Sequence, residues 1–435
     1  MVGTKTVQFD HPVLKGKIKV PGDKSISHRA IMLGSIAQGR TAVKGFLDGE
    51  DCLRTIDIFK QLGVSIERSG TDVLIDSPGI YNWKNPTNDL YAGNSGTTAR
   101  LMLGILSGSA VTCRLTGDES LSKRPMKRVT VPLQSMGASI SNGEGGEYLP
   151  LSIAGGAIKG IDYNMPVASA QVKSAILFAG LNAEGITVVK EKAVSRDHTE
   201  RMFKQFGAKI EQEGNTVSIT GGQLLKGTNV IVPGDISSAA FFMVAAAMVE
   251  GSSVDFVDVG LNPTRTGIIE VLRQMGAQVE VIDQKGEAGE PYGTIRISHA
   301  PLKGMEISGT IIPTLIDELP IIALLATQAE GTTVIKDAAE LRVKETDRIA
   351  AVTNELTKLG AQIEATEDGM IIKGPTPLSG GNLESYGDHR LGMMAAIAAL
   401  ISESSIQIDD ASCIAISYPN FFDHLTKLVT AGNEE

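Results

Sequence analysis

The chain has 435 residues, of which 42% are hydrophobic and 21% charged, as in ordinary globular proteins of two or three domains. Its formal net charge of -10 argues against a general nucleic-acid or acidic-membrane binder, so any site for anions has to be local. The three cysteines lie far apart, which suggests neither a disulfide framework nor a cysteine-rich zinc site. The first residues lack the apolar core of a signal peptide, and no uncharged apolar run reaches about 18 residues. A cytoplasmic protein without a membrane span is therefore expected.

The first predicted helix begins in the stretch PGDKSISHR and continues through the apolar run AIMLGSIA. Lys24, Ser25 and Arg29 are thereby crowded at a helix start. A phosphate-binding P-loop is excluded, because that motif needs Gly-Lys-Ser/Thr in sequence and Asp23 interrupts it here. Two interpretations remain at this point: Asp23 or Ser25 caps the helix and the cations are solvated, or the helix start binds an anion.

The chain repeats itself, and the repeats define its architecture. The segment VPGDKS at residue 20 returns as VPGDIS at residue 232, which divides the chain into two halves of about equal length. A strand-like phrase recurs six times, each time after a mostly apolar segment of helical length, as GRTAVKGF, GSAVTCRL, GITVVKEK, GSSVDFVD, GTTVIKDA and SSIQIDDA. In five copies a second helix and a pair of alternating strands follow. The sequence predicts an α/β fold with three βαβαββ units in each half and with the apolar helices buried.

The second half stops without the last strands of its third unit. We expect the N-terminal strand segment before Pro21 to complete this domain. The predicted domains are therefore residues 1–20 plus 235–435, and an inserted domain of residues 21–234, joined by a two-strand hinge.

Polar residues gather in the turns before the predicted helices. The turns before the first helix of each unit are PGDKSISHR, GNSGTTAR, PVASAQVK, PGDISS, IPTLIDELP and YGDHR, and those before second helices include TGDESLSKRP, KAVSRDHTER and LRVKETDR. Helix starts carry free N–H groups and the positive end of the helix dipole, so they bind phosphate and carboxylate readily. If several of these turns converge, the protein binds one or two small, highly anionic substrates.

Each of these turns also has a purely structural interpretation. In RVKETDR, Glu345 and Arg348 are spaced for an i,i+3 ion pair on a helix surface, and GNSGT fits a tight turn. Asp388 fits the N-cap of the helix that follows GDHR, while Arg390 fits a carboxylate or phosphate contact. Asp317 lies beside an apolar stretch, where it is either a cap or a desolvated general base.

The motifs VPGDKSISHR, GNSGTTAR, SKRPM, ASAQVKSA, RVKETDR and GDHR occur in this order over essentially the whole chain. Together they resemble the 5-enolpyruvylshikimate-3-phosphate synthase family. The resemblance implies a transferase that joins phosphoenolpyruvate to the 5-hydroxyl of shikimate 3-phosphate in aromatic amino-acid biosynthesis and releases phosphate. It also implies a pair of inside-out α/β domains with three βαβαββ units each, no metal or organic cofactor, and inhibition by glyphosate. We expect a monomer whose partners are small anionic substrates.

Carried over residue by residue, the resemblance implies three groups of site residues. Shikimate 3-phosphate would be bound by Lys24, Ser25, Arg29, Ser169, Ala170, Gln171, Arg196, Asp317 and Lys344. Phosphoenolpyruvate would be bound by Lys24, Asn94, Gly96, Arg124, Gln171, Glu345, Arg348 and Arg390. As catalytic groups, Asp317 would take the proton of the attacking hydroxyl, Glu345 would deliver one to the methylene carbon, and Lys24 would assist both.

Three positions depart from the pattern usual in that family. Ala170 replaces the second serine of the Ser-Gln motif, Glu340 stands where many members carry asparagine, and Ile416 precedes the final Ser-Tyr-Pro where a lysine is common. They look like features of a divergent bacterial branch.

Two alternatives stay open on the sequence alone. The related enzyme that transfers enolpyruvyl to UDP-N-acetylglucosamine has the same fold, but it usually carries a reactive cysteine in the loop before an Arg-Pro. The corresponding loop here, GDESLSKRP, has no cysteine, and Cys113 lies earlier, in a strand phrase. The second alternative is a non-catalytic anion-binding protein on the same scaffold.

Overall fold

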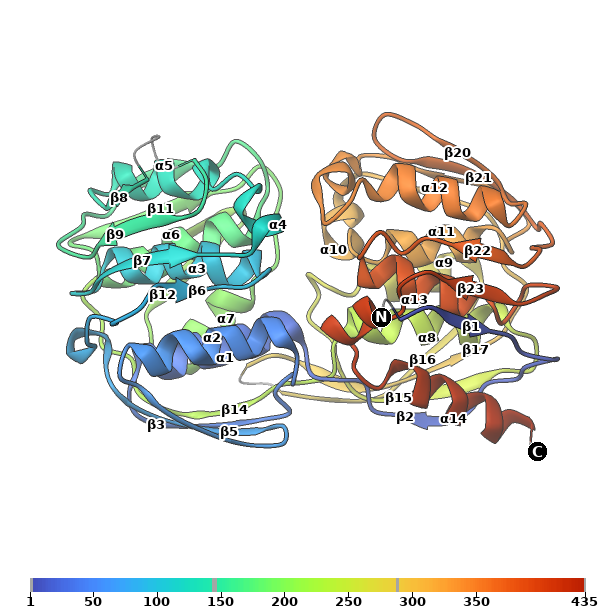
Figure 1. The fold of residues 1–435 in the computed structure, drawn as a ribbon, viewed down its shortest axis with the longest axis horizontal. Coiled ribbons are helices and arrows are strands. Elements are labelled where there is room, and N and C mark those ends of the chain that lie inside the picture. The colour runs from blue at the N-terminus through green and yellow to red at the C-terminus, as the bar shows by residue number, and fades with distance from the viewer. Residues whose placement is uncertain (1–2, 143–146, 287–288, 434–435) are drawn as a thin grey trace. The chain divides into compact units, whose positions relative to one another are not determined.

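The computed structural model describes residues 3–142, 147–286 and 289–433. The chain divides into two compact units (Figure 1). Unit 1 comprises Met1–Pro21, Pro233–Gly286 and Pro291–Glu435, and unit 2 comprises Gly22–Val232 and Glu287–Glu290. Each unit has its own hydrophobic core.

Unit 2 contains three four-stranded sheets, and each sheet combines one parallel with two antiparallel pairings. The first, in the order β14-β3-β5-β4, comprises β3 (Gln38–Lys44), β4 (Ser65–Ser69), β5 (Asp72–Pro78) and β14 (Asn229–Ile231). The second, in the order β6-β7-β9-β8, comprises β6 (Leu90–Tyr91), β7 (Thr112–Thr116), β8 (Ser139–Ser141) and β9 (Leu151–Ala154). The third, in the order β10-β11-β13-β12, comprises β10 (Asp162–Asn164), β11 (Ile186–Lys190), β12 (Ile210–Glu213) and β13 (Thr216–Thr220).

The helices of unit 2 pack against one another inside these sheets. They are α1 (Lys24–Ile36), α2 (Glu50–Gln61), η1 (Ile80–Asn82), α3 (Gly96–Ser107), α4 (Glu119–Ser122), α5 (Lys127–Ser135), α6 (Ala170–Asn182) and α7 (His198–Gln205). Helix α3 packs closely on α6, and α1 packs on α2 and α7. Figure 1 shows β3, β5 and β14 along the outer edge of the unit, with α1 and α2 inside them.

Side-chain caps fix where the three buried helices of unit 2 begin. Asp23 accepts a hydrogen bond from the N–H of Ile26 at 2.8 Å, so the predicted capping role of Asp23 is confirmed. Ser95 caps α3 and Ser169 caps α6 in the same way. The first residues of these helices are therefore held at defined places at the ends of packed elements.

Unit 1 contains two four-stranded sheets and one three-stranded sheet. The first, in the order β16-β17-β15-β2, comprises β2 (Lys15–Ile18), β15 (Ser253–Gly260), β16 (Gln278–Lys285) and β17 (Tyr292–Ser298). The second, in the order β18-β19-β21-β20, comprises β18 (Glu306–Ile307), β19 (Gly331–Ile335), β20 (Gln362–Ala365) and β21 (Met370–Gly374). The third, in the order β1-β23-β22, comprises β1 (Lys5–Val7), β22 (Gly381–Leu383) and β23 (Ile406–Ile408).

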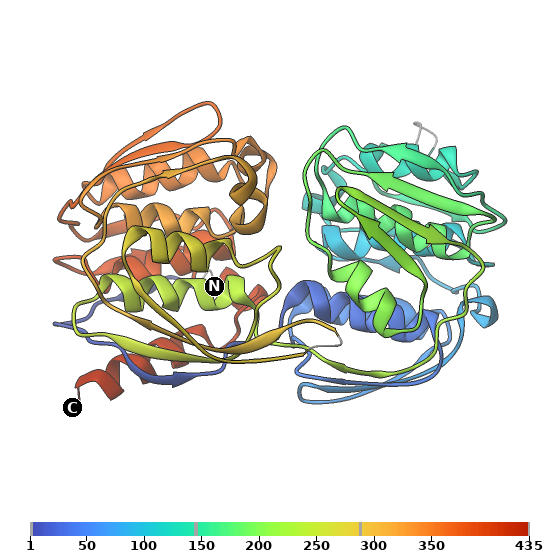
Figure 2. The same cartoon turned by 180° about the vertical axis from the view of Figure 1, so that it is seen from behind.

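The helices of unit 1 are again largely internal, as the view from behind in Figure 2 shows. They are α8 (Ile236–Met248), α9 (Gly267–Met275), η2 (Gly309–Ile311), α10 (Ile312–Leu315), α11 (Leu319–Ala326), η3 (Ala339–Val343), α12 (Arg348–Lys358), α13 (His389–Ala398), η4 (Ser412–Ile416) and α14 (Phe421–Asn433). Helices α8, α11 and α13 pack against one another, and every residue of α8 is buried.

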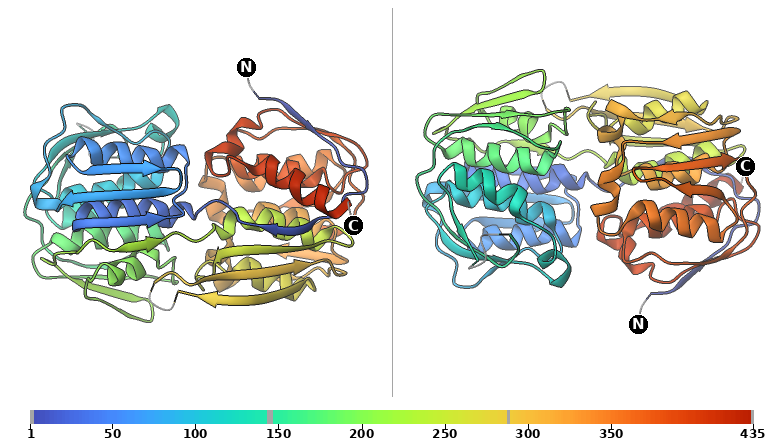
Figure 3. Two further views of the ribbon diagram at one scale, coloured as in Figure 1. Left: turned by 90° about the horizontal axis from the view of Figure 1, so that it is seen from below. Right: turned by 90° about the horizontal axis from the view of Figure 1, so that it is seen from above.

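The N-terminal segment supplies two strands to unit 1. Strand β1 pairs antiparallel with β23, and β2 pairs parallel with β15. Figure 3 shows the blue N-terminal segment beside the red C-terminal part of this unit. Conversely, β14, which precedes α8 in the chain, pairs with β3 of unit 2. The strands before α1 and α8 thus each lie in a different unit from the helix that follows them.

The stretch IPTLIDELP, predicted as a turn before an apolar helix, contains a short helix of its own. Helix α10 ends at Leu315, α11 begins at Leu319, and the two helical segments are bent by 112°. Pro320 explains the break, because it has no N–H to donate and its ring clashes with the carbonyl of Ile316. The turn between the helices holds Asp317, which therefore is not a cap. In the described part of the chain no single helix is long and apolar enough to cross a membrane; only this bent pair reaches the length and composition together.

Candidate active site

The helix starts of unit 2 meet through side-chain hydrogen bonds. Thr98 of α3 lies 3.5 Å, between Oγ1 and Nδ1, from His28 of α1. Gln171 of α6 donates from Nε2 to Thr97 Oγ1 of α3 at 3.0 Å. The polar turns before α1, α3 and α6 are thus brought together, and we call the predicted site residues around them the unit 2 cluster. It contains Lys24, Ser25, Arg29, Asn94, Gly96, Arg124, Ser169, Ala170, Gln171 and Arg196.

Arg29 is a buried cation whose described hydrogen bonds all go to neutral oxygens. Its side chain donates to Thr199 Oγ1 at 2.7 Å, to Ser174 Oγ at 2.9 Å and to the backbone carbonyl of Ser25 at 3.0 Å. The residue is only 4% exposed, and burial lowers the pKa of the guanidinium to about 10, so it stays charged at neutral pH. A fixed charge bound by neutral acceptors is suited to an anionic ligand.

Lys24 is the first residue of α1, and its ammonium group forms an ion pair with Asp51 of α2. The side chain is 26% exposed, so solvent and ligands reach it. The neighbouring His28 is fully buried. Burial lowers its pKa to about 3, although the charge of Asp51 opposes this shift. The imidazole is therefore neutral, and the positive charge at this helix start resides on Lys24 and Arg29.

Asn94, Gly96 and Arg124 lie together at the start of α3. Asn94 accepts from Arg124 Nη2 at 2.9 Å and donates to Asp118 Oδ2 at 2.8 Å. Gly96 is the first residue of α3, and a Cβ there would come within 2.7 Å of Arg100 Nη1. The absence of a side chain at Gly96 thus leaves room beside two arginines.

The start of α6 carries Ser169, Ala170 and Gln171. Ser169 is the N-cap, Ala170 is the first helical residue, and Gln171 accepts from Arg100 Nη1 at 2.8 Å. Arg196 is half-buried in the turn between β11 and α7. Arg100 is a contact that the sequence analysis did not single out.

In unit 1, Arg348 is the centre of the second cluster, which also contains Asp317, Lys344, Glu345 and Arg390 and is called the unit 1 cluster below. Arg348 donates to Asp388 Oδ2 at 2.8 Å, to Glu345 Oε2 at 2.7 Å and to Asp317 Oδ1 at 3.3 Å. The predicted Glu345–Arg348 pair is present, but the expected surface position is wrong for Arg348, because its side chain is only 1% exposed. Burial opposes its charge, yet the acidic partners raise the pKa of Arg348 above its ordinary value.

Asp317 is bound by cations from three elements. Its Oδ1 lies 3.6 Å from Lys344 Nζ, its Oδ2 lies 3.9 Å from Arg390 Nη2, and its backbone carbonyl accepts from Arg390 Nη1 at 3.1 Å. Lys344 also pairs with Glu340 at 3.1 Å. Asp388 caps α13 as predicted, by accepting from the N–H of Arg390 at 2.9 Å.

Glu345 is the more accessible acid of this cluster, with 37% of its side chain exposed. Burial opposes its ionisation, but the charges of Arg348 and His389 outweigh burial and lower the pKa of Glu345 below its ordinary range. The carboxylate is therefore ionised in the ligand-free protein. Asp317 and Glu345 meet on opposite Nη atoms of one guanidinium.

The sequence predicted the cations of the site but not the side chains that bind them. Asp51 pairs with Lys24, Ser174 and Thr199 hold Arg29, and Glu318 lies 3.8 Å from Arg390. Thr199 is 170 residues from Arg29 and neutral, so no local pattern marks it. Asp51 stands in the first turn of α2, shortly after the first strand phrase, so its place at a helix start could have marked it.

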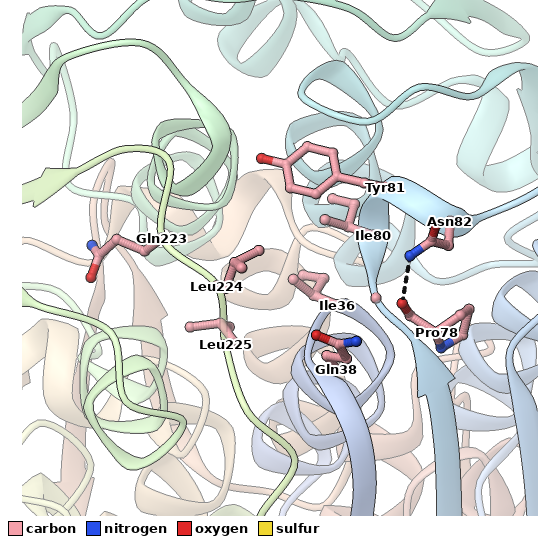
Figure 4. A pocket seen from close by; sticks show the side chains of 10 residues that line it. Ile36, Gln38, Pro78, Ile80, Tyr81, Asn82, Gln223, Leu224 and Leu225 are labelled. Carbon is pink, nitrogen blue, oxygen red and sulfur yellow. Dashed lines mark hydrogen bonds between the residues drawn. The ribbon is translucent and has the colours of Figure 1, made fainter.

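A surface pocket in unit 2 does not belong to these clusters (Figure 4). Its lining includes no charged residue and consists of Ile36, Gln38, Pro78, Gly79, Ile80, Tyr81, Asn82, Gln223, Leu224 and Leu225. It touches Ile36, the last residue of α1, whereas Lys24 is the first, roughly 18 Å away along the helix. This apolar pocket is therefore unsuited to a phosphate. Among the residues that the structure describes, no group of three or more His, Cys, Asp or Glu side chains could hold a metal ion.

Comparisons with known proteins agree with this chemistry. Residues 10–425 match the family model of EPSP synthase (3-phosphoshikimate 1-carboxyvinyltransferase). The chain is 59% identical over 419 residues to the 3-phosphoshikimate 1-carboxyvinyltransferase of Bacillus pumilus, covering 96% of this chain and 98% of that protein. It is 58% identical over 416 residues to the Bacillus subtilis protein of the same name, covering 95% and 97%. A solved structure of EPSP synthase from Acinetobacter baumannii is similar, with a TM-score of 0.90, 47% identity and 98% of each chain covered. The mixed α/β fold with many small mixed sheets is thereby confirmed, and the chain belongs to the EPSP synthase family.

Proposed function

We propose that the two clusters carry out the reaction of this family, in which phosphoenolpyruvate gives its enolpyruvyl group to the 5-hydroxyl of shikimate 3-phosphate and phosphate is released. As a member of the family, the chain is a shikimate-pathway transferase that acts on anionic substrates. The observation that carries the residue roles is that Lys24, Arg348 and Arg390 each lie in the first turn of a helix. There the helix dipole adds to the attraction of each cation for phosphate or carboxylate.

Arg29 and Arg196 are assigned to the phosphate of shikimate 3-phosphate, with Lys24, Ser25, Ser169, Ala170, Gln171, Asp317 and Lys344 completing that substrate's contacts. Arg29 supports this role because it is buried, charged and bound only to neutral oxygens in its described hydrogen bonds. A guanidinium binds phosphate through two parallel N–H groups, which fixes orientation as well as affinity.

Phosphoenolpyruvate is assigned to Lys24, Asn94, Gly96, Arg124, Gln171, Glu345, Arg348 and Arg390. The two arginines of the unit 1 cluster differ in how available they are. Arg348 is 1% exposed and already bound to three carboxylates, whereas Arg390 is 13% exposed and its guanidinium lies no closer than 3.8 Å to the carboxylate oxygens of Asp317 and Glu318. We therefore assign the stronger contact with the carboxylate of phosphoenolpyruvate to Arg390.

Two acids divide the proton transfers. Asp317 takes the proton of the attacking hydroxyl as its oxygen bonds to C2 of phosphoenolpyruvate, and Glu345 delivers a proton to the methylene carbon, which gives a tetrahedral intermediate. The C–O bond to phosphate then breaks, and the new methyl group returns a proton to Glu345, which restores the double bond. An efficient acid at neutral pH needs a pKa closer to neutrality than that of Glu345 in the ligand-free protein. An arriving anion that competes for Arg348 would raise the pKa of Glu345, and Lys24 would neutralise the departing phosphate.

A phosphate-release assay with both substrates tests the function directly. We expect phosphate only when both are present, and Asp317→Asn should bind shikimate 3-phosphate while losing most turnover. Asp76→Asn, in an exposed ion pair with Arg40, is the matched control and should keep wild-type turnover. Wild-type turnover in Asp317→Asn would remove its assignment as the base.

The same assay separates the alternatives. Release of phosphate with UDP-N-acetylglucosamine instead of shikimate 3-phosphate would favour the related transferase, although the matching family model favours the shikimate enzyme. Calorimetric binding of both anions without turnover would indicate a non-catalytic binding protein.

Units 1 and 2 are assigned to the two inside-out domains expected for the family, joined by two strands. The support is that each unit has three sheets, a buried helical core and bounds close to the predicted ones. We also propose a cytoplasmic monomer; light scattering on the purified protein tests the monomer, and cell fractionation tests the location.

A further inference from the structure

Lys173 is a fully buried lysine that the reaction described above does not use. It lies in the first turns of α6, two residues after Gln171, and its side chain is 0% exposed. Burying an ammonium group is costly unless charged partners compensate for the lost water. Its Nζ lies 2.8 Å from Glu191 Oε2 and 2.7 Å from Glu200 Oε1, and both carboxylates are almost fully buried.

The two carboxylates stand at the two ends of the segment that contains Arg196. Glu191 directly follows β11, and Glu200 lies in the first turn of α7. Between them, Ser195 donates its N–H, at 3.4 Å, and its hydroxyl to Glu191, while its carbonyl accepts from Lys173 at 3.3 Å. One ammonium group therefore holds both ends and the middle of this segment, and Arg196 is the next residue after Ser195.

The same helix start also holds Arg29. Thr199 accepts from Arg29 Nε at 2.7 Å and shares a 2.7 Å hydrogen bond with Ser174, the residue after Lys173. Ser174 in turn accepts from Arg29 Nη2. Helix α6 thus fixes α7 through Lys173 and Glu200, and α7 fixes Arg29 through Thr199.

The formal charges of Lys173, Arg29, Glu191 and Glu200 balance only with Lys173 present. Lys173 and Arg29 supply two positive charges, and Glu191 and Glu200 supply two negative ones. Burial raises the pKa of Glu200 and opposes the charge of Lys173, but the two carboxylates outweigh burial and raise the pKa of Lys173. Without the lysine, the two buried carboxylates would draw in water or another cation, such as Arg29, whose charge already interacts with Glu200.

We propose that Lys173 is a positioning residue for shikimate 3-phosphate: it fixes the segment from Glu191 to Glu200 and thereby places Arg29 and Arg196 without touching the substrate. The inference rests on the proposed binding role of these two arginines. It predicts a selective loss, because Arg124 and Arg390, assigned to phosphoenolpyruvate, are not held by Lys173.

The test is steady-state kinetics on Lys173→Met, a neutral side chain of similar length. We expect KM for shikimate 3-phosphate to rise at least tenfold, with KM for phosphoenolpyruvate changed less than threefold. The double variant Lys173→Met/Glu200→Gln removes one charge of each sign, so it should recover most of the lost affinity. Lys190→Met, which breaks an exposed ion pair with Asp162 on the neighbouring strand, is the matched control and should leave both constants unchanged.

If Lys173→Met does not fold, Ser195→Ala tests whether the segment from Glu191 to Glu200 must be fixed. This variant deletes only the hydroxyl that donates to Glu191. A threefold or larger rise confined to KM for shikimate 3-phosphate is expected. Folded variants with unchanged KM for this substrate, or with both KM values raised equally, would overturn the proposal. Arg196→Met, measured alongside, tests the binding role of Arg196 itself. An unchanged KM for shikimate 3-phosphate in this variant would contradict the proposed binding role of Arg196, and not the positioning of the segment by Lys173.

Discussion

Lys24 is the residue whose charge the proposed reaction needs most directly. Lys24→Met should lower turnover by roughly a hundredfold or more, because losing a cation that meets the departing phosphate costs about 3 kcal/mol of transition-state stabilisation. The measurement is phosphate release at saturating substrate. Lys123→Met is the matched control, since Lys123 forms an exposed pair with Glu119. Similar rates in the two variants would show that the position of Lys24 is not catalytic.

Gly96 leaves space that a methyl group would fill. A Cβ there would lie 2.7 Å from Arg100 Nη1 and 3.7 Å from Arg124 Nη1, so Arg100 would have to move away from Gln171. Glyphosate, the inhibitor that the family resemblance implies, is longer than phosphoenolpyruvate and should be obstructed more. Gly96→Ala is expected to raise the glyphosate inhibition constant roughly tenfold or more and KM for phosphoenolpyruvate only a fewfold. Equal inhibition constants for the two forms would remove position 96 from the binding site.

His28 makes the folded protein sensitive to acid. Burial lowers its pKa to about 3, whereas an unfolded chain takes up the proton near the ordinary value of about 6.5. The stability that the neutral imidazole supports is therefore complete above about pH 6.5 and is lost as pH falls from there toward 3. By linkage this loss amounts to roughly 2 kcal/mol at pH 5.

The comparison that isolates this effect is His28→Asn. Urea unfolding of both proteins at pH 7 and pH 5 should show that the wild type loses about 2 kcal/mol more than the variant over this interval. Parallel losses in the two proteins would mean that the burial of His28 does not control the acid response.

Among the helices and strands, the sequence predicted the features that depend on a few neighbouring residues. Apolar segments of helical length, with Asp23 and Asp388 as caps, identified buried helices and their starts because both signals lie within a few residues of the helix. The pairing of β14 with β3, or of β1 with β23, joins strands far apart in the sequence. Only the incomplete sixth repeat indicated that the N-terminal segment completes the domain formed by the second half of the chain. The turn before α11 was predicted, but the short helix α10 within the same stretch was not.

The candidate site residues divide in the same way, into those that the sequence indicates and those that only the fold brings into place. Charged residues in the helix-start turns were visible in the sequence, whereas their partners depend on packing. Thr199 and Ser174 reach Arg29 only because α7 and α6 lie beside α1, and Lys173 finds its two glutamates only in the folded core. A buried network of this kind has no periodicity that a sequence pattern could reveal.

The close packing of α3 on α6 depends on Gly104. A Cβ at this position would lie 2.1 Å from the backbone carbonyl oxygen of Ala175, which cannot rotate away as a side chain can. Gly104→Ala should destabilise the protein by about 1 to 3 kcal/mol or more and separate the helices that begin at Gly96 and Ala170. Gly156→Ala, with no atom within 4 Å of the new methyl, is the control in urea unfolding. Equal stability of the two variants would contradict this packing argument.

At the scale of the whole molecule, the net charge of -10 would repel two anionic substrates if it acted uniformly. Screening limits the reach of surface charges to about 8 Å at physiological salt, so the nearby cations decide binding. Each of these cations has a nearby partner: Asp51 pairs with the part-exposed Lys24, and hydroxyls accept from the buried Arg29. An acidic protein can therefore be selective for phosphates.

The residues proposed to bind shikimate 3-phosphate come from both units, and this division gives the last prediction. Saturating shikimate 3-phosphate should slow amide hydrogen exchange in residues 24–29 and 196–200 of unit 2 and also in residues 340–348 of unit 1. The reason is that bound ligand suppresses local opening of the segments that contact it. Shikimate without its phosphate is the control, and it should protect the segments of Arg29 and Arg196 least. Protection confined to unit 2 would contradict the assignment of Asp317 and Lys344 to this substrate, even in an enzyme that turns over.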